Sequence, residues 1–409
     1  MRLILFGHPA FFGSHSMDRF AAMIVKGMRE RGHEAQLWTP PAVLVRMATR
    51  PGLRKWLGYI DQYLLFPALA WWRLRREGEG ALVVLTDHSL GMWMWLLHRR
   101  PHVIHCHDFI AQRTAAGEFP GRQLSASGRL YQALILRGIA LGRNFVAVSE
   151  KTAQDLLRLH PGPAPRVRVV HNGLNYPFRP LAPDVAMRRL RAASVDDIRP
   201  GMLVHIGGNQ WYKNREGVLA LYQAYCEASH ARSGAAAAAG APRPLWMIGP
   251  EPTAAMRAAA ASAEQLGGKV CFLQGMSTAA VHAAYALAAV LLFPSLEEGF
   301  GWPVIEAMAC GIPVLTTARA PMQEIGGGLA LLMEPMEPGQ AQAWARRNVG
   351  VLLELLSWPQ DRLEQLSRDS LAWARHFSTE RVLDQYEAIY LAALGPASAA
   401  QAAEAGTAG

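Results

Sequence analysis

The sequence predicts an α/β protein built from two doubly wound parallel sheets, and three observations support this prediction. At 409 residues the chain is longer than one hydrophobic core normally encloses, so two domains are expected. Hydrophobic residues make up 51% and charged residues 18%, which is the balance of a globular protein. Short apolar runs alternate with longer helical stretches in two successive rounds, a pattern typical of repeated strand and helix units.

Each predicted strand is a short apolar run bounded by turn-forming residues. In the first round these runs span residues 3–6, 35–38, 82–85, 103–106, 145–148 and 167–170, and in the second round they span residues 203–206, 245–248, 270–273, 290–293, 314–316 and 330–333. Asn172-Gly173 and the proline-bearing run 176–183 predict a linker between the rounds. We therefore expect domains at 1–175 and 176–375, a final helix at 376–395, a disordered tail at 396–409, and a ligand cleft between the strand carboxyl ends of both domains.

Charge and cysteine content restrict the class of protein. The formal net charge of +9 suits phosphate-bearing substrates, nucleic acid or an anionic membrane, and does not choose among them. The four cysteines stand alone, without the C-x-x-C spacing of a zinc site, which suits a reducing cytosol. The apolar run at the N-terminus is short and ends at Gly7, unlike a signal peptide, so a cytoplasmic protein is expected.

The run from Pro294 to Val314 is the most informative segment, because it places two carboxylates around a glycine loop that opens a helix. Gly299 and Gly301 allow close backbone approach, so free N–H groups at the helix start can face a diphosphate. Pro303 suits the first helical position, which puts Glu306 in the first turn and Glu298 in the loop before it. On spacing alone, a ligand-binding role for the two carboxylates is as well supported as the ordinary explanation, in which Glu306 complements the helix dipole and Glu298 is a solvated loop charge.

The same run resembles the E-x7-E signature of family-four retaining glycosyltransferases with the GT-B fold. The usual pattern is P-S-x-x-E-G-F-G-L-P-x-x-E-A-M-A-x-G-x-P-V, and the visible departure is Trp302 in place of leucine. The resemblance implies two Rossmann-like domains facing a central cleft, and transfer of a sugar from a nucleotide-sugar donor to a hydroxyl acceptor, either lipid-linked or a growing saccharide. It implies that Glu298 contacts the transferred sugar and Glu306 the ribose, and that Gly299, Phe300, Gly301 and Trp302 line the donor site.

Weaker motifs extend the resemblance along the chain. Gly13-Ser14 follows the first strand and is expected on the acceptor side. Arg31-Gly32-His33-Glu34, Val148-Ser149-Glu150 and the run 169–173 match family landmarks, and the segment from Phe377 to Tyr386 resembles the final helix that crosses back to the first domain. The resemblance as a whole implies a hexosyltransferase-like enzyme of polysaccharide biosynthesis.

His107 is the next catalytic candidate, because it follows the predicted strand 103–106 at its carboxyl end. Family members place a histidine of such an H-D step beside the donor sugar, where the imidazole or the backbone carbonyl contacts sugar hydroxyls. His88 is a secondary candidate at the end of the previous strand. His102 and His105 are interpreted as structural histidines hydrogen-bonded within the fold.

The run Gly207-Gly208-Asn209-Gln210-Trp211-Tyr212-Lys213-Asn214 resembles the family's glycine and R-K-N segment. Lys213 matches the lysine that reaches the diphosphate and would stabilise the leaving nucleotide, so we group it with the catalytic residues; Gly207 and Asn209 are expected to bind the donor. Tyr212 stands where arginine is common. Arg215 is an alternative second cation, although a helix-surface arginine is the favoured interpretation.

No D-x-D step occurs in the chain, and the pair Asp196-Asp197 lies in a segment interpreted as surface. The sequence therefore predicts no metal ion and no cofactor.

Residues 53–76 form an unusual insertion between two predicted strands. Leu53, Trp56, Leu57, Ile60 and Leu64 share one helical face, with arginines and lysine before and after the segment. The apolar part is too short to span a bilayer and contains Pro67, but the composition suits an interfacial helix on an anionic membrane. The alternative, favoured on pattern alone, is a helix packed on the sheet with its charges in water.

Two other classes of protein remain open. A Rossmann oxidoreductase lacks support because no G-x-G-x-x-G follows a strand, and binding to nicotinamide would revive it. A sugar-nucleotide sensor or membrane scaffold would bind the donor and never turn it over. The favoured partners are a nucleotide-sugar donor, a saccharide or lipid-linked acceptor and an anionic membrane surface, with no nucleic acid, and peripheral attachment to the inner face of the cell membrane is the accompanying expectation.

Overall fold

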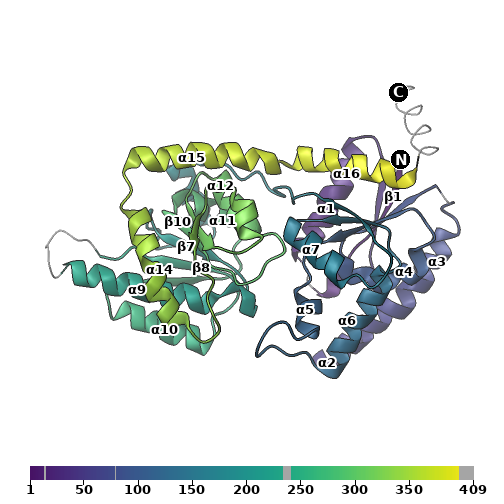
Figure 1. The fold of residues 1–409 in the computed structure, drawn as a ribbon, viewed down its shortest axis with the longest axis horizontal. Helices are drawn as coiled ribbons and strands as arrows, with labels where there is room; N and C mark the ends of the chain where they lie inside the picture. The colour runs from purple at the N-terminus through teal and green to yellow at the C-terminus, as the bar shows by residue number, and fades with distance from the viewer. Residues whose placement is uncertain (13–14, 79, 234–240, 396–409) are drawn as a thin grey trace. The chain divides into compact units, whose positions relative to one another are not determined.

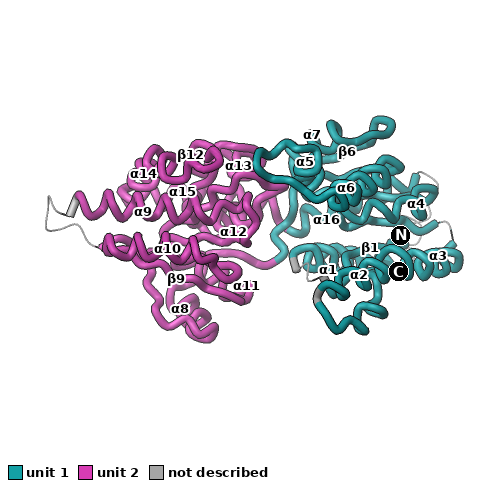
Figure 2. Tube along the Cα trace, turned by 90° about the horizontal axis from the view of Figure 1, so that it is seen from below, with its two compact units in different colours: residues 1–175, 379–409 teal, residues 176–378 magenta. Residues whose placement is uncertain are grey.

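The computed structural model describes residues 1–12, 15–78, 80–233 and 241–395, and these fold as two compact units. Unit 1 comprises residues 1–175 and the chain from Thr379 onward, and unit 2 comprises Tyr176–Ser378 (Figure 2). Each unit contains a sheet of six parallel strands with helices on both faces (Figure 1). The prediction of two Rossmann-like α/β domains is therefore confirmed.

The strand order of unit 1 is β2-β1-β3-β4-β5-β6, and that of unit 2 is β12-β11-β10-β7-β8-β9. The strands of unit 1 are β1 (Arg2–Phe6), β2 (Glu34–Trp38), β3 (Leu82–Leu85), β4 (His102–Cys106), β5 (Asn144–Ala147) and β6 (Arg166–Val169). Those of unit 2 are β7 (Leu203–Ile206), β8 (Leu245–Ile248), β9 (Val270–Leu273), β10 (Val290–Phe293), β11 (Val314–Thr317) and β12 (Leu331–Met333). All twelve predicted strands are present, with ends shifted by no more than one residue.

The helices alternate with the strands along the chain. Unit 1 has α1 (His15–Glu30), α2 (Pro51–Ile60), α3 (Phe66–Leu74), α4 (Met94–Leu97), α5 (Ile110–Ala115), α6 (Ala126–Ile139), α7 (Glu150–Leu159) and α16 (Thr379–Leu394). Unit 2 has α8 (Pro183–Ala192), α9 (Arg215–Ser233), α10 (Ala254–Glu264), α11 (Thr278–Leu287), α12 (Trp302–Ala309), α13 (Met322–Gly326), α14 (Ala341–Leu356) and α15 (Gln360–Ala374). Among the described residues, no helix is long and apolar enough to cross a membrane.

The central strands form because both of their faces are buried. In β1, Ile4 and Phe6 belong to one core cluster, whereas Leu3 and Leu5 belong to another. Successive side chains of a strand point to opposite faces, so a strand covered by helices on both sides is an unbroken apolar run. This pattern is why the strands were predictable from the sequence.

Helix α16 packs against unit 1 through Tyr386 and Tyr390, both fully buried in the same cluster as Leu3. The Arg31-Gly32-His33-Glu34 motif supports this packing. Arg31 Nη2 donates to Asp384 Oδ1 at 2.6 Å, and His33 Nε2 lies 2.6 Å from Glu387 Oε1. The motif therefore has a structural role, since it fastens the last described helix to the first domain.

The insertion between β2 and β3 differs from the favoured interpretation. Helices α2 and α3 are joined by a π-helical turn at Asp61–Leu65, and Phe66, Ala70 and Leu74 are the residues packed on the core. The face predicted to pack is largely exposed, with 65% of Trp56 and 68% of Leu64 accessible. A helix of the insertion therefore packs on the core as the favoured interpretation expects, but it is α3, and the face of residues 53–64 is not the one that packs.

The π-helical turn is held by a buried carboxylate. Asp61 is fully buried and accepts hydrogen bonds from the backbone N–H groups of Val43, Leu44 and Val45 at 2.9 to 3.0 Å. These bonds fix the loop after β2 to the insertion. A π turn adds one residue to the helical ladder, which rotates the following helix relative to α2.

Candidate active site

In unit 2, strand β10 ends at Phe293 and α12 begins at Trp302, with the predicted glycine loop between them. Gly301 is the N-cap residue with φ of +93°, a conformation that favours glycine. The helix starts one residue earlier than predicted, so Pro303 is its second residue. Glu306 is the fifth residue of α12, and its predicted place in the first turn is wrong.

The structure brings two predicted catalytic residues together. Lys213 Nζ donates to Glu298 Oε1 at 2.7 Å and to Oε2 at 3.0 Å. The side chain of Glu298 is 8% exposed and that of Lys213 is 20% exposed. Because this ion pair is largely protected from water, removing either partner would leave the other charge buried without compensation.

Two backbone contacts hold this pair in place. Asn214 adopts a left-handed conformation, and its Nδ2 donates to the Pro294 carbonyl at 2.9 Å. The Leu296 N–H donates to the Tyr212 carbonyl at 2.7 Å. The loop that carries Lys213 is thereby fastened to the loop that carries Glu298, on two neighbouring strands, β7 and β10.

Glu306 is held separately. It is 9% exposed, and its Oε2 accepts a hydrogen bond from the Tyr285 hydroxyl at 3.1 Å. Burial, reinforced by the nearby Glu306 carboxylate, keeps the pKa of Tyr285 well above its ordinary value, so this hydroxyl remains a donor. The carboxylate is thus oriented by a neutral neighbour.

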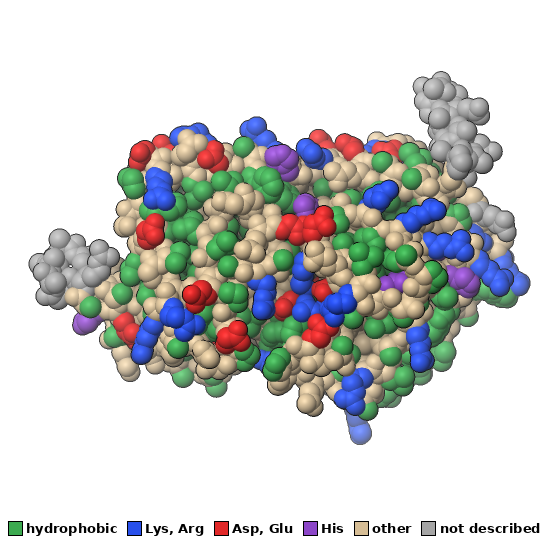
Figure 3. All heavy atoms as spheres, viewed as in Figure 1, with side chains coloured by type: hydrophobic (Ala, Val, Ile, Leu, Met, Phe, Trp, Pro, Cys, Tyr) green, Lys and Arg blue, Asp and Glu red, His purple; other side chains and the backbone are tan. Residues whose placement is uncertain are grey.

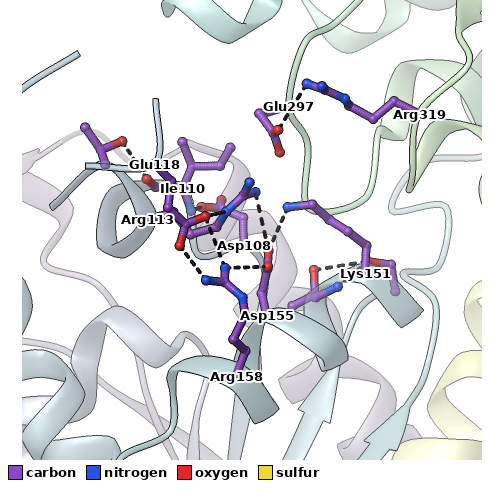
Figure 4. Close-up of polar contacts among 12 residues, drawn as sticks. Asp108, Ile110, Arg113, Glu118, Lys151, Asp155, Arg158, Glu297 and Arg319 are labelled. Atoms are coloured by element: carbon purple, nitrogen blue, oxygen red, sulfur yellow. Dashed lines mark hydrogen bonds and ion pairs between the residues drawn. The ribbon is translucent and has the colours of Figure 1, made fainter. Parts of the chain in front are cut away.

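Phe300 and Trp302 flank Gly301, and their rings lie 6.0 Å apart. The Phe300 ring is also 6.0 Å from that of Phe377 and is buried, so it packs into the body of unit 2. Glu297 is the carboxylate that the sequence analysis did not single out. It is buried and pairs with Arg319 Nη1 at 3.3 Å (Figure 4).

The second glycine segment lies at the carboxyl end of β7. A Cβ at Gly207 would lie 2.9 Å from His205 Nε2 and 3.4 Å from Lys213 Cβ, so glycine is needed for this close approach. The Asn209 side chain donates to the Glu251 carbonyl at 2.8 Å and accepts from Arg215 Nη1. Gly207, Asn209 and Lys213 are therefore neighbours of Arg215.

Arg215 is not a helix-surface residue, and that interpretation is wrong. It is 2% exposed, and burial lowers the pKa of its guanidinium. Nη1 also donates to the Pro250 carbonyl at 3.1 Å, whereas Nε and Nη2 are buried with no hydrogen-bond partner among the described residues. A buried cation with two unused donor nitrogens is costly unless an anion binds there.

His205 is a functional-site neighbour that sequence reasoning missed. Its Nδ1 lies 2.9 Å from the Leu292 carbonyl, so Nδ1 carries the proton, and Nε2 has no partner among the described residues. Burial lowers its pKa to about 4, opposed by the Leu292 hydrogen bond and assisted by Arg215 and Lys213. Both cations therefore lie close to this ring.

The stability of the protein should depend on pH through His205. Its folded pKa is about 4 against an ordinary 6.5, so the unfolded state binds more protons between these values. This contribution is present above pH 6.5 and is lost as the pH falls toward 4, at up to about 1.4 kcal/mol per pH unit. His205→Asn keeps the donor to Leu292 and should flatten the pH dependence of the unfolding free energy by about one proton. Equal slopes for both proteins in denaturant titrations would contradict this assignment.

In unit 1, His107 follows β4 and is buried. Its Nε2 donates to the Thr86 carbonyl at 2.9 Å, while its own carbonyl accepts from Thr152 Oγ1 at 3.3 Å. Burial lowers the pKa of the imidazole, and Nδ1 has no partner among the described residues. The His107 ring is thus neutral, and its Nδ1 lone pair is available to accept a hydrogen bond.

An ion-pair network joins the segments that follow β4 and β5 in unit 1. Asp155 accepts from Lys151 at 2.7 Å and from Arg158 at 3.2 Å, and Glu118 accepts from Arg113 at 2.8 Å (Figure 4). Arg158 also pairs with Glu118, so helices α5 and α7 are joined. Both helices adjoin the carboxyl ends of strands β4 and β5.

The remaining histidines of unit 1 have partners. His102 Nδ1 donates to the Arg100 carbonyl at 2.8 Å, and His105 Nε2 lies 2.7 Å from the Tyr390 hydroxyl, so both are hydrogen-bonded within the fold as predicted. His88 Nδ1 lies 2.9 Å from Asp87 Oδ1, and this carboxylate raises the pKa of His88 against the opposing effect of burial. The acceptor-side candidates Gly13 and Ser14 lie outside the described residues.

Within the described ranges, no group of three or more potential metal-binding side chains comes together. Asp197 pairs with Arg199 at 3.0 Å and with Lys269, and is exposed.

The fold assembled from these parts is GT-B, as comparison with solved structures shows. A sucrose-phosphate synthase from Thermosynechococcus elongatus aligns over 95% of this chain and 98% of its own, with a TM-score of 0.67 and 17% identity. The Anabaena HepE protein in complex with UDP and glucose aligns over 95% and 98%, with a TM-score of 0.63 and 14% identity. At these identities the likeness concerns the fold.

Two family models match the two halves of the chain. Residues 17–176 match "Glycosyltransferase Family 4", and residues 199–331 match "Glycosyl transferases group 1". The predicted donor-site residues Gly207, Lys213, Glu298 and Glu306 fall inside the second match, and His107 falls inside the first. Each unit is therefore similar to a glycosyltransferase family over part of its length.

Curated relatives are similar over parts of the chain. An O-antigen chain mannosyltransferase B of Escherichia coli is 33% identical over 101 residues, which are 25% of this chain and 24% of that protein. A D-inositol 3-phosphate glycosyltransferase of Mycobacterium bovis is 28% identical over 252 residues, 60% of this chain and 48% of that protein. The chain thus matches less than half the length of either relative.

Proposed function

We propose that this protein is a retaining glycosyltransferase that moves a sugar from a nucleotide-sugar donor to a hydroxyl acceptor. The observation that carries the proposal is the gathering of Lys213, Arg215 and Glu298 at the carboxyl end of the unit 2 sheet. Two cations suit a diphosphate, and a carboxylate beside them suits the hydroxyls of a sugar. The match of this unit to a glycosyltransferase family supports the same assignment.

In this proposal the residues of unit 2 hold the donor from its two ends. Glu306, oriented by Tyr285, accepts hydrogen bonds from the ribose, and Lys213 and Arg215 bind the diphosphate. The bond between the anomeric carbon and the diphosphate oxygen breaks, and its electron pair leaves with the diphosphate, where both cations stabilise the new charge. The acceptor oxygen bonds to the anomeric carbon, and its proton passes to the leaving group.

The roles of His107 and Glu298 concern the transferred sugar. The Nδ1 lone pair of His107 is suited to accept a hydrogen bond from a sugar hydroxyl, since its other polar groups are already engaged. Glu298 would exchange part of its contact with Lys213 for sugar hydroxyls when the donor binds. Retention of the anomeric configuration rests on the E-x7-E resemblance, and positive side chains take the place that a divalent metal has in other transferases.

The acceptor is proposed to be a saccharide or a lipid-linked intermediate of polysaccharide synthesis. The name of the Escherichia coli relative supports a polysaccharide product, and the name of the mycobacterial relative supports a phosphorylated acceptor. The HepE structure contains UDP, so uridine is the first base to test.

The exposed face of the insertion supports attachment to an anionic membrane. Trp71 and Trp72 are 46% and 47% exposed, and Arg75 and Arg76 stack over their rings at 3.6 and 3.7 Å. Figure 3 shows Lys and Arg side chains gathered beside hydrophobic ones over the part of unit 1 that contains α3. Aromatic rings next to basic groups are suited to the interface of an anionic bilayer.

This proposal predicts salt-sensitive binding to vesicles. Each basic residue near an anionic surface contributes about 1 kcal/mol, so Arg75→Gln with Arg76→Gln should weaken vesicle binding by roughly 30-fold, and Trp71→Ala should weaken it further. Sedimentation with phosphatidylglycerol vesicles measures this, with Arg346→Gln and Arg347→Gln in unit 2 as the control of equal charge. Wild-type protein that stays in the supernatant at low salt would contradict membrane attachment.

A thermal-shift screen against nucleotide sugars tests the donor proposal. The expected result is a rise in unfolding temperature with one nucleotide sugar and with its bare nucleoside diphosphate, because ligands that bind only the folded state stabilise it. A shift with a nicotinamide dinucleotide and none with any nucleotide sugar would favour the oxidoreductase alternative instead.

A further inference from the structure

Unit 1 contains a pocket of about 450 Å³ to which no role has been assigned so far. Helix α2 of the insertion provides Arg54, Lys55 and Tyr59, helix α6 provides Tyr131, and the loops after β1 and β3 provide His8 and Ser89. This volume is that of a small-molecule site and is sufficient for a monosaccharide with a phosphate group.

The charge of the pocket is positive. Arg54 and Lys55 are exposed, and neither forms an ion pair with a carboxylate in the described part of the chain. None of the described residues that line the pocket is acidic. The nearby carboxylate of Asp87 is engaged by His8 Nε2 at 2.8 Å and by Ser89 Oγ at 2.9 Å. Two adjacent unpaired cations on one wall of a pocket suit a phosphate group.

A rigid aromatic pair also lines the pocket, and Lys55 Nζ lies 5.9 Å from the centroid of the Tyr59 ring. The rings of Tyr59 and Tyr131 are stacked, with centroids 6.0 Å apart and an interplanar angle of 26°. Tyr131 is fixed by the hydroxyl of Tyr63 at 2.5 Å, and Tyr63 belongs to the π-helical turn. A fixed aromatic wall packs against the apolar face of a sugar ring or a lipid chain at little cost in side-chain entropy.

The pocket lies at the carboxyl end of the unit 1 sheet. His8 follows β1, and Ser89 follows β3. His107 binds the carbonyl of Thr86, the residue next to Asp87, and so lies at the same edge. The pocket and His107 therefore belong to the same end of this sheet.

We infer that this pocket binds the acceptor, and that the acceptor carries a phosphate group read by Arg54 and Lys55. The inference rests on the proposed glycosyltransferase function. The tyrosine wall holds the group next to the phosphate, and His8, oriented by Asp87, provides a hydrogen-bonding ring for an acceptor hydroxyl. The phosphate belongs either to a free sugar phosphate or to a lipid at the membrane.

Chemical labelling of Lys55 tests the inference directly. Acetylation of Lys55 by an amine-reactive reagent is followed by peptide mass spectrometry, with Lys26 as the control because its side chain is 78% exposed on α1. The additions are glucose 6-phosphate, glucose, phosphatidylglycerol vesicles and phosphatidylcholine vesicles. An addition present at ten times its dissociation constant should slow Lys55 labelling about tenfold.

Protection of Lys55 but not Lys26 by glucose 6-phosphate supports a free phosphorylated acceptor. The same selective protection by phosphatidylglycerol vesicles alone supports a lipid-borne phosphate. Equal protection by glucose, equal protection of both lysines, or no protection in any arm would overturn the phosphate site.

A pair of variants with equal charge separates the pocket from general attraction. Arg54→Gln with Lys55→Gln removes two charges from the pocket, whereas Arg346→Gln with Arg347→Gln removes two exposed charges from α14 in unit 2. Once the acceptor is identified, the first pair should raise its KM roughly tenfold or more and the second should not. Equal KM values for the two pairs would contradict the assignment. Donor binding, measured separately by thermal shift, is expected to be unchanged in both, so failure of the donor proposal would be recognised independently.

Discussion

Glu298→Gln should lower turnover by roughly 10- to 150-fold while leaving the affinity for the bare nucleoside diphosphate much less affected. Loss of one charged hydrogen bond costs about 1.5 to 3 kcal/mol, and the bond in question is made to the transferred sugar, which the diphosphate lacks. Glu306→Gln should show the opposite pattern, with a similar loss of affinity for the nucleotide, because its proposed partner is the ribose. Initial rates and calorimetric titration with the nucleoside diphosphate distinguish the two effects.

The ion pair between Lys213 and Glu298 also makes the stability of the protein a test of the site. Lys213→Ala slows transfer and also leaves the 8% exposed carboxylate of Glu298 without its partner, so a loss of several kcal/mol in stability is expected. Combining Lys213→Met with Glu298→Gln should recover part of that stability but not the activity. Glu297→Gln is the matched control, since it removes the same charge one residue away and its partner is Arg319. Wild-type turnover in folded Glu298→Gln, Glu306→Gln and Lys213→Ala proteins would refute the site.

Arg215→Met should weaken binding of the nucleoside diphosphate by roughly 10- to 150-fold without destabilising the free protein. Arg215 is 2% exposed, and its Nε and Nη2 have no partner in the described structure, so the cost of burying its charge offsets the two hydrogen bonds that Nη1 makes to Asn209 and to the Pro250 carbonyl. Methionine removes both the buried charge and these two bonds. The bound diphosphate, by contrast, would lose up to two charged hydrogen bonds.

Calorimetric titration and thermal unfolding together check the role of Arg215. Arg188→Met is the control, because Arg188 is exposed on α8 and pairs with the exposed Asp184 at 2.6 Å. The signature is an unfolding temperature that is unchanged or higher combined with weaker binding. Equal binding by Arg215→Met and wild-type protein would exclude Arg215 as the second cation and would leave Lys213 to bind the diphosphate alone.

The sequence predicted the sheets well because strands that are buried on both faces consist of unbroken apolar runs, which are visible in the sequence. The pairing of Lys213 with Glu298 was not predicted, since each was assigned its own partner in the donor. Their contact depends on Asn214 and Tyr212, which connect two loops that are far apart in sequence. The sequence pattern of each loop does not contain that information.

Arg215 and the insertion show where sequence reasoning fails. An arginine early in a helix is usually exposed, and the burial of Arg215 follows from Asn209 and Pro250, which approach it from other segments.

In the insertion, the helical pattern was followed through residues 61–65 as a regular α-helix. The π turn found there changes the phase of the helix, so Phe66 packs inward and Leu64 points to solvent. The pocket of unit 1 combines four separate segments and has no sequence signature at all.

The most direct test of the central claim is a transfer assay with the nucleotide sugar that the thermal-shift screen identifies. The assay measures release of the nucleoside diphosphate and transfer of the labelled sugar by wild-type, Glu298→Gln and Arg215→Met proteins. A glycosyltransferase with the proposed site releases the diphosphate, transfers the label to a hydroxyl acceptor with retained anomeric configuration, and loses at least tenfold in rate in both variants. Tight binding of the nucleotide sugar without any release of diphosphate would contradict the account and identify a sugar-nucleotide sensor instead.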